Sequence, residues 1–262
     1  MNNQICALKA EFIKNRHSKI LLISFIAFSI VPVMGGVFML VTQNPQAMAK
    51  ASLLNTKMEA MKFSAGWESL FMILTMGMGI GGVIIFGFVV SWIFGREYSE
   101  GTVKDMLSLP TSKSMILNAK FILYFLWSLG LAIVNAVLGI AIGAALRFPG
   151  FEFGNMLASL KDYFITTILT VLLGPPIAFF SLWGKGYLAP LGILVLTVVF
   201  SQIITALGYG CYFPWAVPAL FSGAGGEYKE QLNPVSYFIL LLVAAAGYRA
   251  AVFYWKYADH HK

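Results

Sequence analysis

The sequence predicts an all-α integral membrane protein with six membrane-spanning helices, and three observations support that prediction. Of the 262 residues, 59% are hydrophobic and only 11% are charged, whereas soluble domains carry about 25% charged residues. Six apolar runs are each long enough to cross a bilayer, which takes about 20 residues. The charged residues gather in short segments between these runs. We therefore expect residues 1–262 to form a single transmembrane domain.

The first element expected is a helix over residues 1–19 that lies along the membrane interface. Ile5, Leu8 and Phe12 recur on one helical face, while the charged side chains, Glu11 among them, project elsewhere. A disordered basic tail is the alternative. Membrane spans then follow at about residues 20–41, 67–94, 115–146, 162–182, 188–209 and 235–257. Between the first two spans, residues 42–68 have an amphipathic helical pattern, and we expect a helix on the outer surface.

Two pairs of glycines predict close helix contacts in the second and third spans. Gly77 and Gly81 form one small-xxx-small pair, and Gly139 and Gly143 form the other. Small residues at this spacing let helix backbones approach closely in lipid. For the second span, lining of a substrate path is a further interpretation. Asn135 is a lone polar residue deep in the third span, where we expect an interhelical hydrogen bond rather than a transport site.

Two segments interrupt the regular pattern of spans. Pro175 and Pro176 break the fourth span, because two prolines cannot maintain the backbone hydrogen bonds of a helix. A hinge and a static kink are both open interpretations of that break. Residues 211–234 are apolar and aromatic at first, but Pro214 and Pro218 interrupt them, and the apolar part is too short to cross a bilayer. We expect a re-entrant or interfacial loop on the outer face.

The most highly charged segment, residues 96–113, lies between the second and third spans. Its apolar residues recur at helical spacing, namely Val103, Met106 and Leu107. Pro110 then stops the helix, and Thr111 or Ser112 can cap the next one. A short charged helix held between two spans is well placed to receive a push from a soluble partner. A solvated loop is the alternative.

The distribution of basic residues predicts the orientation in the membrane. Twelve of the 18 Lys and Arg residues fall on the side of the two termini, which is also the side of residues 96–113. Because Lys and Arg are enriched in cytoplasmic segments, we expect both termini and the charged segment in the cytoplasm. The basic residues lie in short segments rather than on one contiguous face, which argues against nucleic-acid binding.

The residue order of the charged segment resembles the cytoplasmic coupling region of bacterial permeases of the type-2 ABC (ATP-binding-cassette) exporter family. The resemblance lies in Glu-Tyr-Ser-Glu-Gly-Thr at 97–102, Leu-Ser-Leu-Pro-Thr-Ser-Lys at 107–113 and Ala-Lys at 119–120. In that family the region forms a coupling helix that docks into a groove on a separate ATPase subunit. The resemblance implies that the ATPase is contacted by Arg96, Glu97, Glu100, Gly101, Thr102 and Lys104.

The resemblance also implies which partners the chain needs. ATP and Mg bind to the separate ATPase subunits, and this chain binds no cofactor itself. Six spans are half of such a transporter, so a second permease chain, identical or a sister, would complete it in the lipid bilayer of a bacterial plasma membrane. Drug and peptide-antibiotic export or immunity permeases are the nearest members. The apolar, aromatic spans suit a hydrophobic or amphipathic cargo such as a drug, an antimicrobial peptide or a lipid.

Several motifs that other functions require do not occur in the sequence. There is no Walker-type Gly-x-x-x-x-Gly-Lys-Ser/Thr loop, so ATP hydrolysis requires another polypeptide. No Asp or Glu lies at depth in a predicted span, which argues against an ion-coupled carrier. No catalytic set of side chains and no metal-ligand spacing occurs. The alternative function is a non-ABC carrier, channel or assembly factor whose charged loop binds another partner.

Overall fold

The computed structural model describes residues 3–16, 18–43, 63, 66–103 and 111–257. Over these residues the regular elements are all helices, and six helical segments are long and apolar enough to cross a membrane. The predicted all-α membrane class with six spans is thereby confirmed. The helix expected on the outer surface over residues 42–68 lies mostly outside the described residues. So does the part of the coupling segment that contains Lys104.

The helices follow the predicted spans closely, with two differences. The long helices are α1 (Asn3–Asn15), α2 (Lys19–Thr42), α5 (Trp67–Glu100), α7 (Lys113–Ala145), α8 (Phe153–Val171), α9 (Gly174–Trp183), α10 (Leu188–Ala206) and α12 (Pro234–Tyr257). α5 continues past the predicted end at residue 94 until Gly101, whose φ of 74° is the left-handed conformation that ends many helices. α8 begins well before residue 162, because the chain has already turned at Gly150, where φ is 77°.

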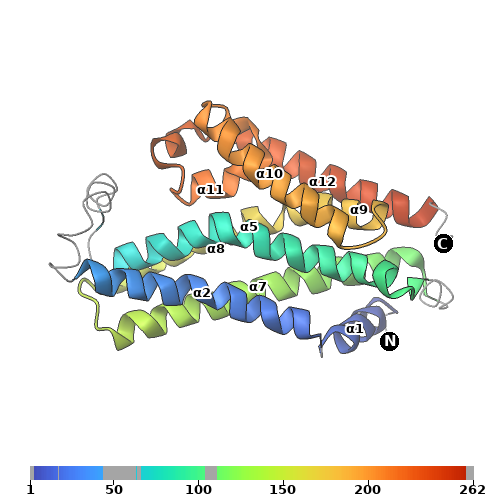
Figure 1. Ribbon diagram of the computed structural model, residues 1–262, viewed down its shortest axis with the longest axis horizontal. Coiled ribbons are helices and arrows are strands. Elements are labelled where there is room, and N and C mark those ends of the chain that lie inside the picture. The colour runs from blue at the N-terminus through green and yellow to red at the C-terminus, as the bar shows by residue number, and fades with distance from the viewer. Residues whose placement is uncertain (1–2, 17, 44–62, 64–65, 104–110, 258–262) are drawn as a thin grey trace.

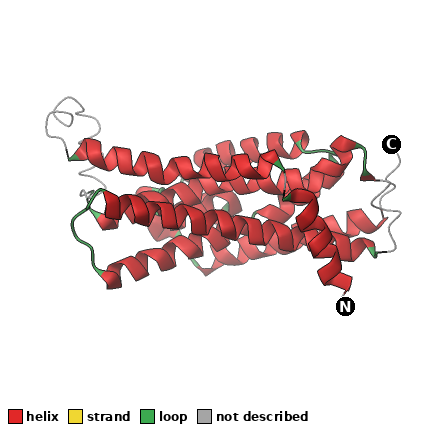
Figure 2. Cartoon of the chain, turned by 90° about the horizontal axis from the view of Figure 1, so that it is seen from below, coloured by secondary structure: helices red, strands yellow, loops and turns green. Residues whose placement is uncertain are grey.

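α5 is the central helix of the bundle. It packs against α2, α7, α8, α9 and α10. Figure 1 shows α2 and α7 on one side of it and α10 and α12 on the other, and Figure 2 shows the long helices running along one common axis. α1, the C-terminal end of α5 and the C-terminal end of α12 lie at the same end of the bundle. We call this end the α1 end.

The segment between α10 and α12 folds back against the bundle as short helices. They are η1 (Gly210–Tyr212), η2 (Pro214–Ala216), α11 (Val217–Phe221) and η3 (Gly226–Gln231). α11 packs against α5 and α8, and its residues Val217 and Leu220 are buried. Tyr212 remains exposed. The elements are short, as expected for a segment interrupted by Pro214 and Pro218. The position of this segment in the bilayer stays a prediction.

Asn135 makes the interhelical hydrogen bonds that its sequence position predicts. Its Nδ2 donates to the carbonyl oxygen of Phe28 in α2 at 2.9 Å. Its Oδ1 accepts from the Tyr163 hydroxyl of α8 at 3.2 Å. Since the side chain is buried and both ends are bonded, Asn135 joins three helices. The expectation of an interhelical bond is therefore confirmed.

The predicted glycine contacts form at three of the four positions. A Cβ atom on Gly77 would clash with Val31 of α2, and one on Gly139 would clash with Leu74 of α5. Gly143 lies against Trp67 and Leu70 in the same way. Among the described residues, no atom lies within 4 Å of the place where a Cβ on Gly81 would be, so no contact with them requires a glycine there.

The closest approaches to a neighbouring backbone involve glycines outside these pairs. A Cβ on Gly95 of α5 would lie 2.5 Å from the carbonyl carbon of Gly186. A Cβ on Gly247 of α12 would lie 2.5 Å from the nitrogen of Pro176 in α9. Backbone atoms cannot rotate aside as a side chain can, so these two contacts depend most strictly on glycine. They hold α9 and the turn after it against α12 and α5.

We predict that Gly247→Ala destabilises the protein by about 1–3 kcal/mol, the range for overpacking a well-packed interior. The added methyl group would meet the backbone of Pro176. Gly81→Ala is the matched control, because the same methyl group there meets open space. Thermal unfolding of the detergent-solubilised chain, followed by tryptophan fluorescence, measures both. An equal loss of stability in the two variants would contradict the packing described.

Candidate coupling site

The α1 end carries the charged segment whose order resembles a coupling region. α5 ends there with Arg96–Glu100, and α7 begins at Lys113 after a short connection. Ser112 caps α7, since its side chain accepts a hydrogen bond from the amide of Met115 at 3.3 Å. Of the two caps that the sequence allowed, Ser112 is the one used. Both helix ends at the charged segment are thus defined by local features of the chain.

Lys120 is the buried cation around which this end is built. It lies two turns into α7 and is 1% exposed. An ammonium group has three N–H donors, and Lys120 has three acceptors around it. These are the carbonyl oxygen of Ile93 at 2.9 Å, Oε2 of Glu11 at 3.4 Å and Oε1 of Glu97. Because an unpaired charge in an apolar interior is very costly, these partners determine where α1 and α5 can lie.

Glu97 is the anion that joins two cations. Its side chain is 2% exposed, and its Oε1 accepts from Lys120 and from Nζ of Lys14 in α1, the latter at 2.7 Å. Glu11 supplies the second carboxylate, which also accepts a long hydrogen bond from Asn15 at 3.5 Å. Two carboxylates and two ammonium groups balance in charge. We call Glu11, Lys14, Glu97 and Lys120 the ion cluster; it joins α1, α5 and α7.

Arg96 extends these contacts to the surface. Its Nη1 donates to the carbonyl oxygen of Lys14 at 3.4 Å, and its guanidinium lies over the ring of Trp92 at 5.7 Å. Its Nε pairs with Oε1 of Glu100 at 2.8 Å. Arg96 therefore adds one more contact between α1 and α5 and holds the exposed Glu100 in place.

The face of α1 that meets the bundle carries Glu11. Glu11 is buried at 7% exposure, whereas Ile5 and Phe12 are 48% and 51% exposed. Glu11 lies on a different face from Ile5 and Phe12, as the helical pattern predicts, and that face is buried against the bundle. The reason is that Lys120 lies beneath α1 and requires a carboxylate, so the helix turns Glu11 inward. Ile5 and Phe12 then face outward, where a lipid surface can cover them.

The predicted contact residues divide into buried and exposed groups. Glu97 is buried in the ion cluster, so its carboxylate is not available to a partner in this conformation. Glu100 and Gly101 are exposed, and Thr102 is half-buried with a hydroxyl that has no hydrogen-bond partner among the described residues. Lys104 lies outside the described residues. Contact with an ATPase stays a prediction. Of the predicted contact residues that the structure describes, those from Glu100 onward are the ones a partner can reach.

Sequence reasoning missed Glu11, Lys14 and Lys120 as members of the site. A signal was present for Lys120, which stands inside the third apolar run, where a charge needs a partner. No comparable signal marks Glu11, because it sits in a helix rich in other charges. Within the described residues, no group of three or more His, Cys, Asp or Glu side chains could hold a metal ion.

The fold and this end define a multi-span helical membrane protein with a structured, charged surface beneath two adjacent spans. A family model described as ABC-2 family transporter protein matches residues 7–202. The chain therefore belongs to the ABC-2 transporter family. It is also similar to the bacitracin transport permease protein BCRB of Bacillus licheniformis, with 27% identity over 181 residues, 69% of this chain and 86% of that protein.

Family membership assigns the chain its general role. It is a permease subunit of an ABC transporter, embedded in a membrane, and its family implies partnership with an ABC ATPase. The alternative of a non-ABC carrier, channel or assembly factor is set aside by this match. The matched residues include all four members of the ion cluster.

We predict that Lys120→Met destabilises the protein by about 3–5 kcal/mol, the cost of breaking a buried ion pair. The substitution leaves Glu11 and Glu97 with one ammonium group between them, from Lys14. Glu100→Gln is the control; it breaks the partly exposed pair with Arg96 and costs less than about 1 kcal/mol. Thermal unfolding in detergent compares the two. If both variants unfold like the parent chain, the cluster does not stabilise this end.

Proposed function

We propose that this chain is the membrane-spanning subunit of an ATP-driven exporter, powered by a separate ATPase subunit that binds ATP and Mg. The observation that carries the proposal is the match to the ABC-2 family over residues 7–202, which takes in most of α1 and all of α5 and α7. The exposed residues at the α1 end then serve as the ATPase contact. Glu100 and Gly101 are exposed at the C-terminal end of α5, so a partner can reach them without unfolding a helix.

The ion cluster supports a mechanism in which the α1 end moves as one unit. Separating Glu97 from Lys120 would break a buried ion pair and leave each charge with one partner fewer in an apolar interior, which costs several kcal/mol. A push on Glu100 therefore moves α5, α7 and α1 together rather than bending the end of α5 alone. Because α5 packs against five other long helices, that movement reaches most of the bundle.

We propose that two such permease chains, identical or sister chains, form the transporter. Apolar side chains along α2 and α10 are exposed in the single chain, for example Ile26 and Val195. In a membrane they face lipid or the second chain. With the positive-inside rule, the basic α1 end lies in the cytoplasm and both termini are cytoplasmic, in a bacterial plasma membrane.

The proposed cargo is a hydrophobic or amphipathic compound, and an amphipathic peptide antibiotic is our first choice. The similar permease of Bacillus licheniformis is named for bacitracin transport. The apolar, aromatic spans of this chain suit such a cargo, and a drug or a lipid is the alternative. Co-purification with a candidate ATPase in lipid nanodiscs tests the proposal, with bacitracin added as the probe. Faster ATP hydrolysis in its presence is the expected result.

We predict that Glu100→Lys abolishes transport and uncouples ATP hydrolysis while the chain still inserts in the membrane. The charge reversal changes an exposed residue of the proposed contact and repels Arg96. Glu152→Lys is the control, since Glu152 is exposed just before α8, away from the α1 end. ATPase stimulation and cell survival in bacitracin measure the effect. Full activity of Glu100→Lys would count against this contact site.

A further inference from the structure

The break between α8 and α9 leaves a backbone carbonyl that a side chain of α7 binds. α8 ends at Val171, and α9 begins at Gly174 with Pro175 and Pro176 in its first turn. Pro175 has no N–H group, so it cannot donate to the carbonyl four residues earlier, which is that of Val171. The hydroxyl of Tyr124 donates to that oxygen instead, at 3.1 Å.

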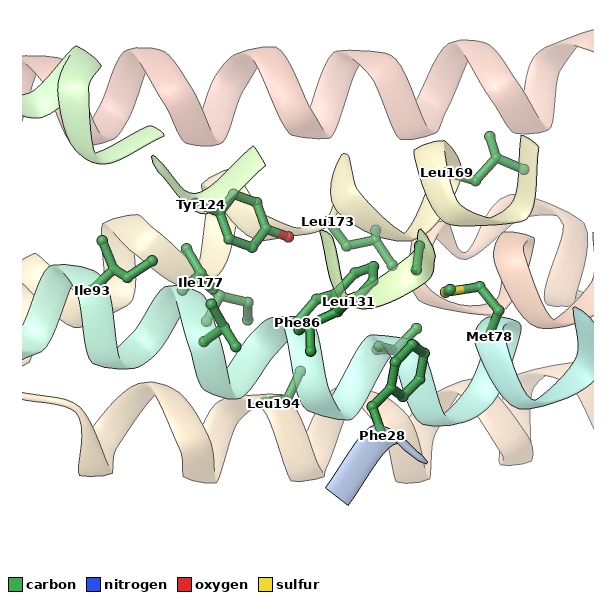
Figure 3. Close-up of a cluster of buried hydrophobic side chains, with 14 of the residues drawn as sticks. Phe28, Met78, Phe86, Ile93, Tyr124, Leu131, Leu169, Leu173, Ile177 and Leu194 are labelled. Carbon is green, nitrogen blue, oxygen red and sulfur yellow. The ribbon is translucent and has the colours of Figure 1, made fainter. Parts of the chain in front are cut away.

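The surroundings of Tyr124 are shaped around this bond. Tyr124 is 2% exposed, and Figure 3 shows its hydroxyl directed toward Leu173, with Ile177 nearby. A Cβ on Gly174 would lie 2.5 Å from the Tyr124 hydroxyl oxygen, so only glycine leaves room for the ring. On another side, Pro176 lies against Gly247 of α12. The break is therefore held by α7 and α12 together.

Tyr124 lies one helical turn from Lys120 on α7. Residues four apart on a helix share a face, and here both are buried. Lys120 binds α1 and α5 through the ion cluster, while Tyr124 binds the carbonyl freed at the break. One turn of a rigid helix thus connects the α1 end with the interruption in the fourth span.

We propose that Lys120 and Tyr124 are positioning residues that transmit movement of the α1 end to the α8–α9 break. The break is then a hinge with two states, one with the Tyr124 hydroxyl on the Val171 carbonyl and one without it. Displacement of α7 at the ion cluster shifts the balance between these states and so the angle between α8 and α9. This inference rests on the proposed function, because an ATPase supplies the displacement.

The test uses the full chain alone in nanodiscs of phosphatidylethanolamine and phosphatidylglycerol. In a Cys6→Ser, Cys211→Ala background, spin labels are placed at Val137→Cys in α7 and Trp183→Cys at the end of α9. Both side chains are exposed in the native chain. Double electron–electron resonance then measures the distance from α7 to the end of α9, which changes when α9 turns at the break. We predict that Tyr124→Phe raises the population of a second distance by about fivefold, the factor that one net hydrogen bond contributes.

Tyr163→Phe is the matched control. It also removes a buried tyrosine hydroxyl, whose one proton is shared between the carbonyl oxygen of Ala132 at 3.0 Å and Oδ1 of Asn135 at 3.2 Å, but it lies within α8 rather than at the break. Its distance distribution should match that of the parent chain. If Tyr124→Phe and Tyr163→Phe behave alike, the break is a static kink and the proposal is overturned.

Lys120→Met tests the link between the two residues. Lys120→Met should also raise the population of the second distance. The double variant with Tyr124→Phe should raise that population no further than the larger single effect, because the two residues act in series. Additive effects, or no effect of Lys120→Met, overturn the link. If Lys120→Met does not fold, Lys14→Met perturbs the cluster more gently and is judged by the same outcomes. No ATPase is present, so these results stand apart from the identity of the partner.

Discussion

The α1 end depends on the buried ammonium group of Lys120. A charge in this position requires acceptors on all of its donors, and they come from α1 and α5. Glu11 must therefore face inward, and Glu97 must lie one turn beyond Ile93 on α5. Helix packing in lipid lacks a strong hydrophobic driving force, because lipid tails are as apolar as leucine. An ion cluster supplies a specificity that apolar contacts alone would not give these three helices.

α7 supplies the polar contacts along much of the bundle. Lys120 binds α1 and α5, Tyr124 binds the freed carbonyl of α8, and Asn135 binds α2 and α8. In the hydrocarbon region every backbone polar group needs a partner inside the protein. A helix interrupted by two prolines can persist there only because another helix brings a donor to it. Besides packing its apolar face, α7 thus partners groups that its neighbours leave unsatisfied.

Features that depend on a single segment of the chain could be predicted from the sequence. Span number follows from hydropathy, a helix cap at Thr111 or Ser112 from local chemistry, and the role of Asn135 from its isolation in an apolar run. Rotation of each helix about its axis could not be predicted in the same way. A lipid-facing side and a buried side are both apolar, so periodicity does not separate them, as the exposure of Phe12 and the empty space at Gly81 show. The partners of Lys120 depend on that rotation.

Two carboxylates of the charged segment therefore have different tasks although they lie three residues apart on α5. Glu97 faces inward and joins the helices, and Glu100 faces outward beside Arg96. A residue that holds the unit together cannot also be released to a partner without the cost of separating buried charges. A partner at this end must accordingly act through the exposed residues. Because those residues continue directly from a helix fixed by the ion cluster, a force applied there enters the bundle through the helix backbone.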